Sequence, residues 1–210
     1  MRRGIVALIG IILALVFILV GLVGPWYGMS TKTSYGDSEA SISLTATTMT
    51  SGGVTQTKSH ADARAEAEKY GGSTEGYDVV NTTFIFTILA FILSILALVF
   101  ILGYMFMTGK ENMMKNLGMI FSILTFVLAL IAVFYFMVAL PGTNEMKDSA
   151  GNEIGFWYSE SISGTSISYG PGISWYLMLI GAIFGLIAAI FLLKEKTTAP
   201  MPAAPQPPQQ

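Results

Sequence analysis

The residues that could do chemistry are few, and they lie together in one hydrophilic stretch. His60 is the only histidine, and Asp62, Glu66, Glu68 and Glu75 follow it closely. A zinc site takes ligands from several histidines, cysteines or carboxylates, but the chain has no cysteine. One histidine among alternating charges is instead typical of a solvated helix face. The sequence therefore predicts no metal site, no cofactor site and no catalytic residue.

Much of the remaining chain consists of long apolar blocks that contain no charged residue. Hydrophobic residues make up 53% of the chain and charged residues only 11%, whereas about a quarter of an ordinary soluble chain is charged. Residues 4–24, 83–107, 117–140 and 174–193 contain no Asp, Glu, Lys, Arg or His. A helix of some 20 residues covers about 30 Å, the thickness of a hydrocarbon core. The sequence therefore predicts a membrane α-helical protein whose four transmembrane helices form a left-handed four-helix bundle.

The first of these blocks follows two basic residues, Arg2 and Arg3, as the core of a signal peptide does. Its apolar run is about twice as long as such a core, and no A-x-A-like cleavage site follows it. We therefore expect this block to stay in the protein as a membrane anchor.

The segments between and beyond the blocks differ in charge. The N-terminus, residues 108–116 and residues 194–210 together carry six basic and two acidic residues, whereas residues 25–82 and 141–173 carry five basic and eleven acidic residues. Basic residues near the ends of spans favour the cytoplasm. We therefore expect a multi-pass protein of the cell (plasma) membrane with both termini cytoplasmic and the two longer loops outside. The proline-rich tail, 194–210, is expected to be disordered.

Both outer loops contain strand patterns. Apolar or β-branched residues alternate over 27–35 and 40–48, a turn follows at 51–53, and 54–58 can return as a further strand. Residues 60–70 are helix formers ended by two glycines, which predicts a short surface helix over the sheet. In the second loop, 154–162 and 165–169 predict a β-hairpin. Because lone hairpins are marginal in water, we expect one small antiparallel sheet built from both loops.

Aromatic residues gather where the outer loops meet the spans. Tryptophan and tyrosine are enriched at the headgroup level of membranes because one end of each ring is apolar and the other polar. The expected membrane-interface anchors are Trp26, Tyr27, Trp157, Trp175 and Tyr176.

Small residues recur at four-residue spacing within the spans, which lets helix backbones approach closely. Two uses stay open: packing within the bundle, and self-association through the face of Gly181. The expected helix-packing residues are Gly10, Ala14, Gly118, Ser122, Gly181, Gly185 and Ala189.

The layout of four spans, a long β-rich first outer loop, a tight inner turn and a shorter second outer loop resembles the claudin and PMP22-like tetraspan superfamily. Pro25-Trp26 looks like the first tryptophan of that family's W…GLW…C…C signature, and the resemblance implies that Trp26 anchors the sheet to the membrane. The Gly-Leu-Trp and the cysteine pair are not in the first loop, and Asn81 stands where the family often has arginine. The Gly170-Pro171-Gly172 and Trp175-Tyr176 motifs are similar to those of cysteine-free microbial four-span proteins.

The plain chemistry of the outer loops favours a non-enzymatic, claudin-like envelope protein. Its extracellular β-sheet would mediate lateral or cell-to-cell protein contacts. The alternative is an accessory or assembly subunit of a membrane channel, transporter or secretion complex. The spans hold none of the ionisable residues that transport pathways use, so we expect the membrane part to be a scaffold. The expected partners are the lipid bilayer and either a second copy, giving a homo-oligomer, or another membrane protein. The acidic outer surface disfavours nucleic acid.

Overall fold

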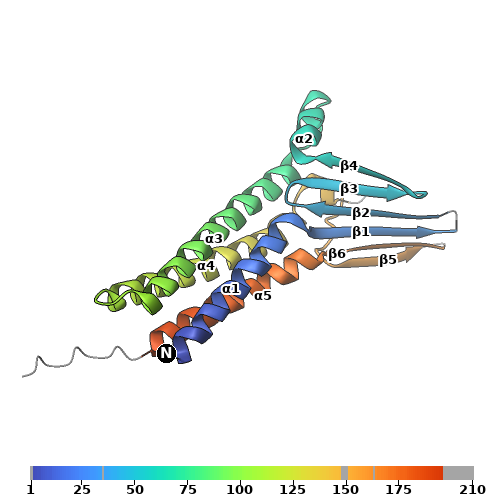
Figure 1. Ribbon diagram of the computed structural model, residues 1–210. Helices are drawn as coiled ribbons and strands as arrows, with labels where there is room; N and C mark the ends of the chain where they lie inside the picture. The colour runs from blue at the N-terminus through green and yellow to red at the C-terminus, as the bar shows by residue number, and fades with distance from the viewer. Residues whose placement is uncertain (1, 35, 148–150, 163, 196–210) are drawn as a thin grey trace, which may run out of the picture.

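Four long helices lie side by side, and a β-sheet extends from one end of them (Figure 1). The structure is a computed structural model, and it describes residues 2–34, 36–147, 151–162 and 164–195. The expected disordered tail therefore lies outside the described residues from position 196 onward. All four helices are long and apolar enough to cross a membrane. Their bounds are α1 Arg2–Val23, α3 Glu75–Phe106, α4 Glu111–Ala139 and α5 Ile173–Lys194.

Two helices begin earlier than the apolar blocks predict. Helix α3 starts at Glu75 and not near residue 83, while α4 starts at Glu111 and not near residue 117. Polar residues can continue a helix where it leaves an apolar environment, and Glu75, Asp78 and Glu111 suit the positive N-terminal ends of these helices. The turn between α3 and α4 is correspondingly short, with Gly109 at a positive φ of 83°.

Small residues lie where the helices approach one another. Helix α1 packs against α5 and α3, and α4 packs against α3 and α5. A Cβ added at Gly181 would lie 3.1 Å from Phe17 Cβ and 3.3 Å from Ala14 O, so α1 crosses α5 closely at this point. The Gly181 position therefore packs against α1 within the chain. All seven expected packing residues are buried: Gly10, Ala14, Gly118, Ser122, Gly181, Gly185 and Ala189.

The sheet has six antiparallel strands in the order β4-β3-β2-β1-β6-β5. The first long loop supplies β1 to β4 and the second supplies β5 and β6. Pairing between β1 and β6 joins the two loops, which confirms the expected shared sheet. The bounds are β1 Pro25–Thr33, β2 Gly36–Ser43, β3 Ala46–Ser51, β4 Val54–Ser59, β5 Tyr158–Ile162 and β6 Thr165–Pro171.

The prediction of one strand over 40–48 is wrong, because the chain reverses at residues 44–45. Ser43 Oγ accepts hydrogen bonds from the backbone N–H groups of Thr45, at 3.3 Å, and Ala46, at 3.0 Å. A serine hydroxyl that bonds the backbone in this way stabilises a turn in place of a continued ladder. Two strands, β2 and β3, therefore stand where the alternation predicts one, and the first loop forms a four-stranded meander.

The first strand of the second loop begins later in the sequence than the alternation of residues predicts. Strand β5 begins at Tyr158 and not near Ile154. Ile154 and Phe156 are buried under the sheet in irregular backbone. Alternating apolar residues can fill a core without forming a strand, and sequence periodicity does not separate these two cases.

The short helix α2 spans His60–Lys69, close to the predicted 60–70. Ser59 caps its start by accepting a hydrogen bond from Asp62 N at 3.1 Å. None of its residues is buried, so it does not cover the sheet as predicted; it projects from the end of β4 (Figure 1). Arg64 ties it to α3, because its guanidinium lies 2.6 Å from Asp78 Oδ1.

The junction of β6 with α5 generates a stability prediction. A Cβ at Gly172 would lie 2.7 Å from the carbonyl carbon of Pro25 and closer still to its oxygen. Backbone cannot give way as a side chain can, so Gly172→Ala should destabilise the fold by about 1–3 kcal/mol. At Gly28 the nearest such atom is 3.9 Å away, so Gly28→Ala serves as the matched control. Thermal unfolding in detergent measures both, and equal midpoints for the two variants would contradict the packing described.

Candidate functional site

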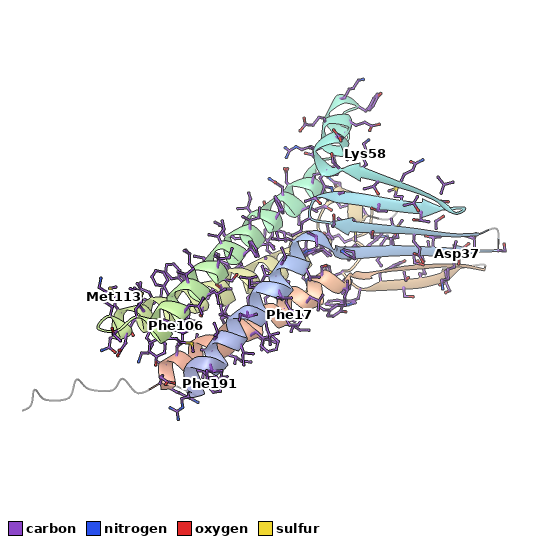
Figure 2. All side chains as sticks on the ribbon, in the orientation of Figure 1. Phe17, Asp37, Lys58, Phe106, Met113 and Phe191 are labelled. Carbon is purple, nitrogen blue, oxygen red and sulfur yellow. The ribbon has the colours of Figure 1, made fainter. Side chains whose placement is uncertain are left out.

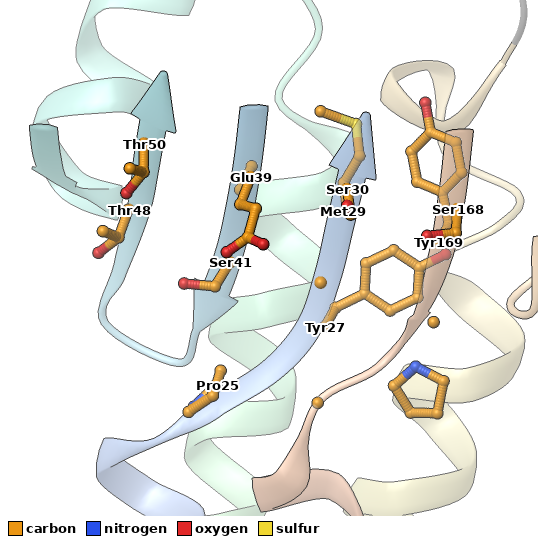
Figure 3. Close-up of a pocket in the computed structure, with 15 residues that line it drawn as sticks. Pro25, Tyr27, Met29, Ser30, Glu39, Ser41, Thr48, Thr50, Ser168 and Tyr169 are labelled. Atoms are coloured by element: carbon orange, nitrogen blue, oxygen red, sulfur yellow. The ribbon is translucent and has the colours of Figure 1, made fainter. Parts of the chain in front are cut away.

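The side of the sheet that faces away from the bundle is lined by hydroxyl groups. Strand alternation and the observed register place ten serine and threonine residues on this side, which we call the hydroxyl face, together with the charged residues Lys32, Asp37 and Glu39. Figure 3 shows part of it, with Glu39 among the hydroxyls over an open hollow of about 470 Å³. The face comprises Ser30, Ser41, Thr48, Thr50, Thr55, Thr57, Ser159, Ser161, Ser166 and Ser168.

Neighbouring strands share these hydroxyls in pairs. Thr48 and Thr57 lie 3.0 Å apart through their Oγ1 atoms, and Thr50 and Thr55 lie at the same distance. Each hydroxyl can donate one hydrogen bond and accept two, so a paired hydroxyl keeps capacity for a further partner. Among the described residues, no three His, Asp or Glu side chains are placed to hold one metal ion. The arrangement offers hydrogen bonding over a broad surface on which Lys32, Asp37 and Glu39 are the charged side chains of the paired strands.

The opposite side of the sheet closes over a second cavity, which we call the bundle-side pocket. It measures about 290 Å³ and lies between the sheet and the starts and ends of the helices. The side chains around it are mostly apolar, and none of them is Asp, Glu, Lys or Arg. The lining residues are Tyr27, Met29, Ala40, Ile42, Thr47, Met49, His60, Gly76, Tyr77, Val80, Leu140, Met146 and Tyr169.

His60 belongs to this pocket and not to a solvated helix face. Its ring is part-buried, its Nε2 lies 2.8 Å from Ser43 O, and its centroid is 5.9 Å from that of Tyr77. The sequence shows that His60 starts a helix. It does not show that the Ser43 turn brings a carbonyl to that histidine, so the role of His60 in the pocket is not predicted.

An aromatic cluster fixes the sheet to the bundle beside this pocket. Trp26 meets Phe136 edge-on with centroids 5.3 Å apart, and Tyr27 lies 5.2 Å from Phe156. Phe156 in turn lies 5.8 Å from Trp175. Both buried indoles have acceptors: Trp26 Nε1–H donates to Gly21 O and Trp175 Nε1–H to Val133 O. Edge-on aromatic pairs add to the stability that burial provides.

The five expected interface anchors divide into two groups. Trp26, Tyr27 and Trp175 are buried inside the protein, where they pack between the sheet and the helices. Trp157 and Tyr176 are 56% and 42% exposed at the same level of the molecule. Sequence position places all five near the junction but does not separate the two groups.

No protein-family model matches this chain, and no curated protein matches it.

The aromatic cluster predicts that two tryptophan-to-alanine substitutions lower the stability of the fold by different amounts. Trp26→Ala deletes a fully buried ring and should cost about 3–5 kcal/mol of stability. Trp157→Ala, at an exposed ring of the same type, should cost well under half of that. Thermal unfolding in detergent compares the two, and a similar loss at both positions would show that Trp26 is not part of a packed core.

Tyr27 predicts a loss of stability in alkali. Burial, and secondarily the neighbouring Tyr169, raises the pKa of Tyr27 above its ordinary 10.0. The unfolded chain therefore releases this proton at a lower pH than the folded protein does, so stability falls as the pH rises above about 10. The limiting slope is about 1.4 kcal/mol per pH unit.

Unfolding midpoints measured between pH 9 and pH 11.5 or so should show this decline in the wild type, and Tyr27→Phe should remove one proton's share of it. An unchanged slope in Tyr27→Phe would place the titrating group elsewhere.

Proposed function

We propose that this chain is a four-span protein of the cell membrane, with both termini in the cytoplasm and the sheet outside. The surface of the bundle supports insertion, because each helix carries exposed apolar side chains such as Ile9, Val99, Phe134 and Ile183. Asp37 at the tip of the sheet and Met113 at the start of α4 lie at opposite ends of the molecule (Figure 2). Lys110 in the α3–α4 turn, and Arg3 and Lys194 at the ends of α1 and α5, lie toward the Met113 end, and basic residues near the ends of spans favour the cytoplasm.

The sheet is proposed to mediate lateral or cell-to-cell protein contacts, in the manner of a claudin-like or PMP22-like envelope protein. The observation that carries this proposal is the hydroxyl face, a broad surface that no described element of the chain covers. The strands at the two edges, β4 and β5, each pair on one side only. An unpaired edge can take up a strand of another chain, and surface hydroxyls can bond a partner without the desolvation cost of charges.

The orientation predicts which positions react from outside. The chain has no cysteine, so each introduced cysteine is the only reactive thiol. Thr55→Cys, on β4, should react with a membrane-impermeant maleimide in intact cells, whereas Lys110→Cys, in the α3–α4 turn, should react only after permeabilisation. The reverse pattern would mean that the protein has the opposite orientation in the membrane. Equal reactivity of the two cysteines in intact cells would contradict the proposed spans.

The same two cysteines test the contact surface. With a benzophenone attached in native membranes, Thr55→Cys should give a cross-linked species of defined mass in most of the protein, because the reagent lies on the hydroxyl face. Lys110→Cys should stay monomeric.

The mass of the adduct identifies the partner. A doubled mass supports contact between copies, while a stoichiometric larger protein supports the alternative of an accessory or assembly subunit. Monomers from both positions would overturn the proposal that the sheet makes contacts.

A further inference from the structure

Two polar atoms that line the bundle-side pocket have no hydrogen-bond partner among the residues that the structure describes. They are Tyr27 Oη and His60 Nδ1. Tyr27 is only 2% exposed, so bulk water does not reach its ring. A buried polar group without a partner costs free energy, and most such groups in proteins are paired. The pocket therefore presents unmet hydrogen-bonding capacity in a mainly apolar space, whose other polar side chains are Thr47, Tyr77 and Tyr169.

The bonding capacity of each atom can be assigned. His60 Nε2 lies 2.8 Å from Ser43 O, and a carbonyl oxygen only accepts, so Nε2 carries the proton and donates. In a neutral imidazole the other nitrogen, Nδ1, is then an acceptor. The Tyr27 hydroxyl keeps its proton because burial raises its pKa, so it can donate. These two unpartnered atoms thus offer one donor and one acceptor.

The remaining lining determines what else a ligand must have. Met29, Ile42, Val80, Leu140 and Met146 surround the space, which suits a hydrocarbon body. No Asp, Glu, Lys or Arg side chain lines the pocket to neutralise an ionic headgroup, and burying an unpaired charge is costly. The volume of about 290 Å³ is about twice the ~150 Å³ cavity that admits benzene. It accommodates one short chain but not a two-chain lipid.

We propose that the bundle-side pocket binds a neutral single-chain amphiphile whose polar group is a hydroxyl, a fatty alcohol with a chain short enough for this volume. A hydroxyl both donates and accepts, so it can bond Tyr27 Oη, His60 Nδ1 or both. Leu140, directly after α4, and Val80, near the start of α3, place the pocket at one end of the apolar helices. The proposal goes beyond the contact function of the sheet and concerns its other side.

Photolabelling of the full-length protein in nanodiscs tests this. The probe is 1-decanol bearing a diazirine near its far end, and mass spectrometry locates the label. We expect labelled peptides to contain pocket residues such as Met49 or Met146. Unlabelled 1-decanol should compete for them, while decane and decanoate should compete at least about fivefold less well, since one lacks the hydroxyl and the other is charged.

The variants separate binding from folding. Tyr27→Phe keeps the ring and should reduce labelling about five- to tenfold, whereas Tyr176→Phe removes an exposed hydroxyl outside the pocket and should leave labelling unchanged. Ala40→Leu fills the pocket and should abolish labelling even if Tyr27→Phe does not fold. Equal competition by decane, or undiminished labelling in a folded Tyr27→Phe or Ala40→Leu variant, would overturn the proposal.

Discussion

The antiparallel pairing of β1 with β6 is the interaction on which the rest of the structure depends. Strand β1 follows α1 within two residues, and β6 precedes α5 as closely, so pairing these strands also sets α1 beside α5. The Ser174 hydroxyl donates to Val20 O at 3.2 Å and Gly172 N to Trp26 O at 2.8 Å, which continues the link from strands to helices. The close crossing of the two helices at Gly181 then follows from the same placement.

Because the sheet is attached to the helices through β1 and β6, its two sides have different environments. On one side the aromatic rings of Trp26, Tyr27 and Phe156 are buried against the bundle, and the bundle-side pocket lies next to them. On the other side no helix of the described chain covers the strands, so hydroxyl groups can stay in water without an apolar core. The period of two along each strand separates these environments residue by residue. The proposed contact surface and the proposed ligand pocket can therefore lie on opposite faces of one sheet.

The helices could be predicted from the sequence because an uncharged run of some 20 residues has few other structures open to it. The additional turns of α3 and α4 could not, since polar residues such as Asp78 fit a helix end or a loop equally well. The alternation of residues predicted strands, but it continues across the turn at Ser43 and across Phe156, and neither position is part of a continuous strand. At Ser43 a local hydrogen bond decides the backbone conformation, and at Phe156 tertiary packing decides it. The pocket was not predicted, because His60 and Tyr27 lie far apart in sequence and only the sheet register brings both to its lining.

A disulfide between β1 and β6 tests the pairing most directly. Ser30 and Ser168 are Cα partners, and directly opposite residues of antiparallel strands lie about 4.5–5.5 Å apart, within disulfide range. In this cysteine-free chain, Ser30→Cys with Ser168→Cys should oxidise almost completely within one molecule. Ser30→Cys with Ser159→Cys, on the same face but one strand further away, should stay reduced. Failure of the first pair, or equal oxidation of both, would contradict a sheet shared by the two loops.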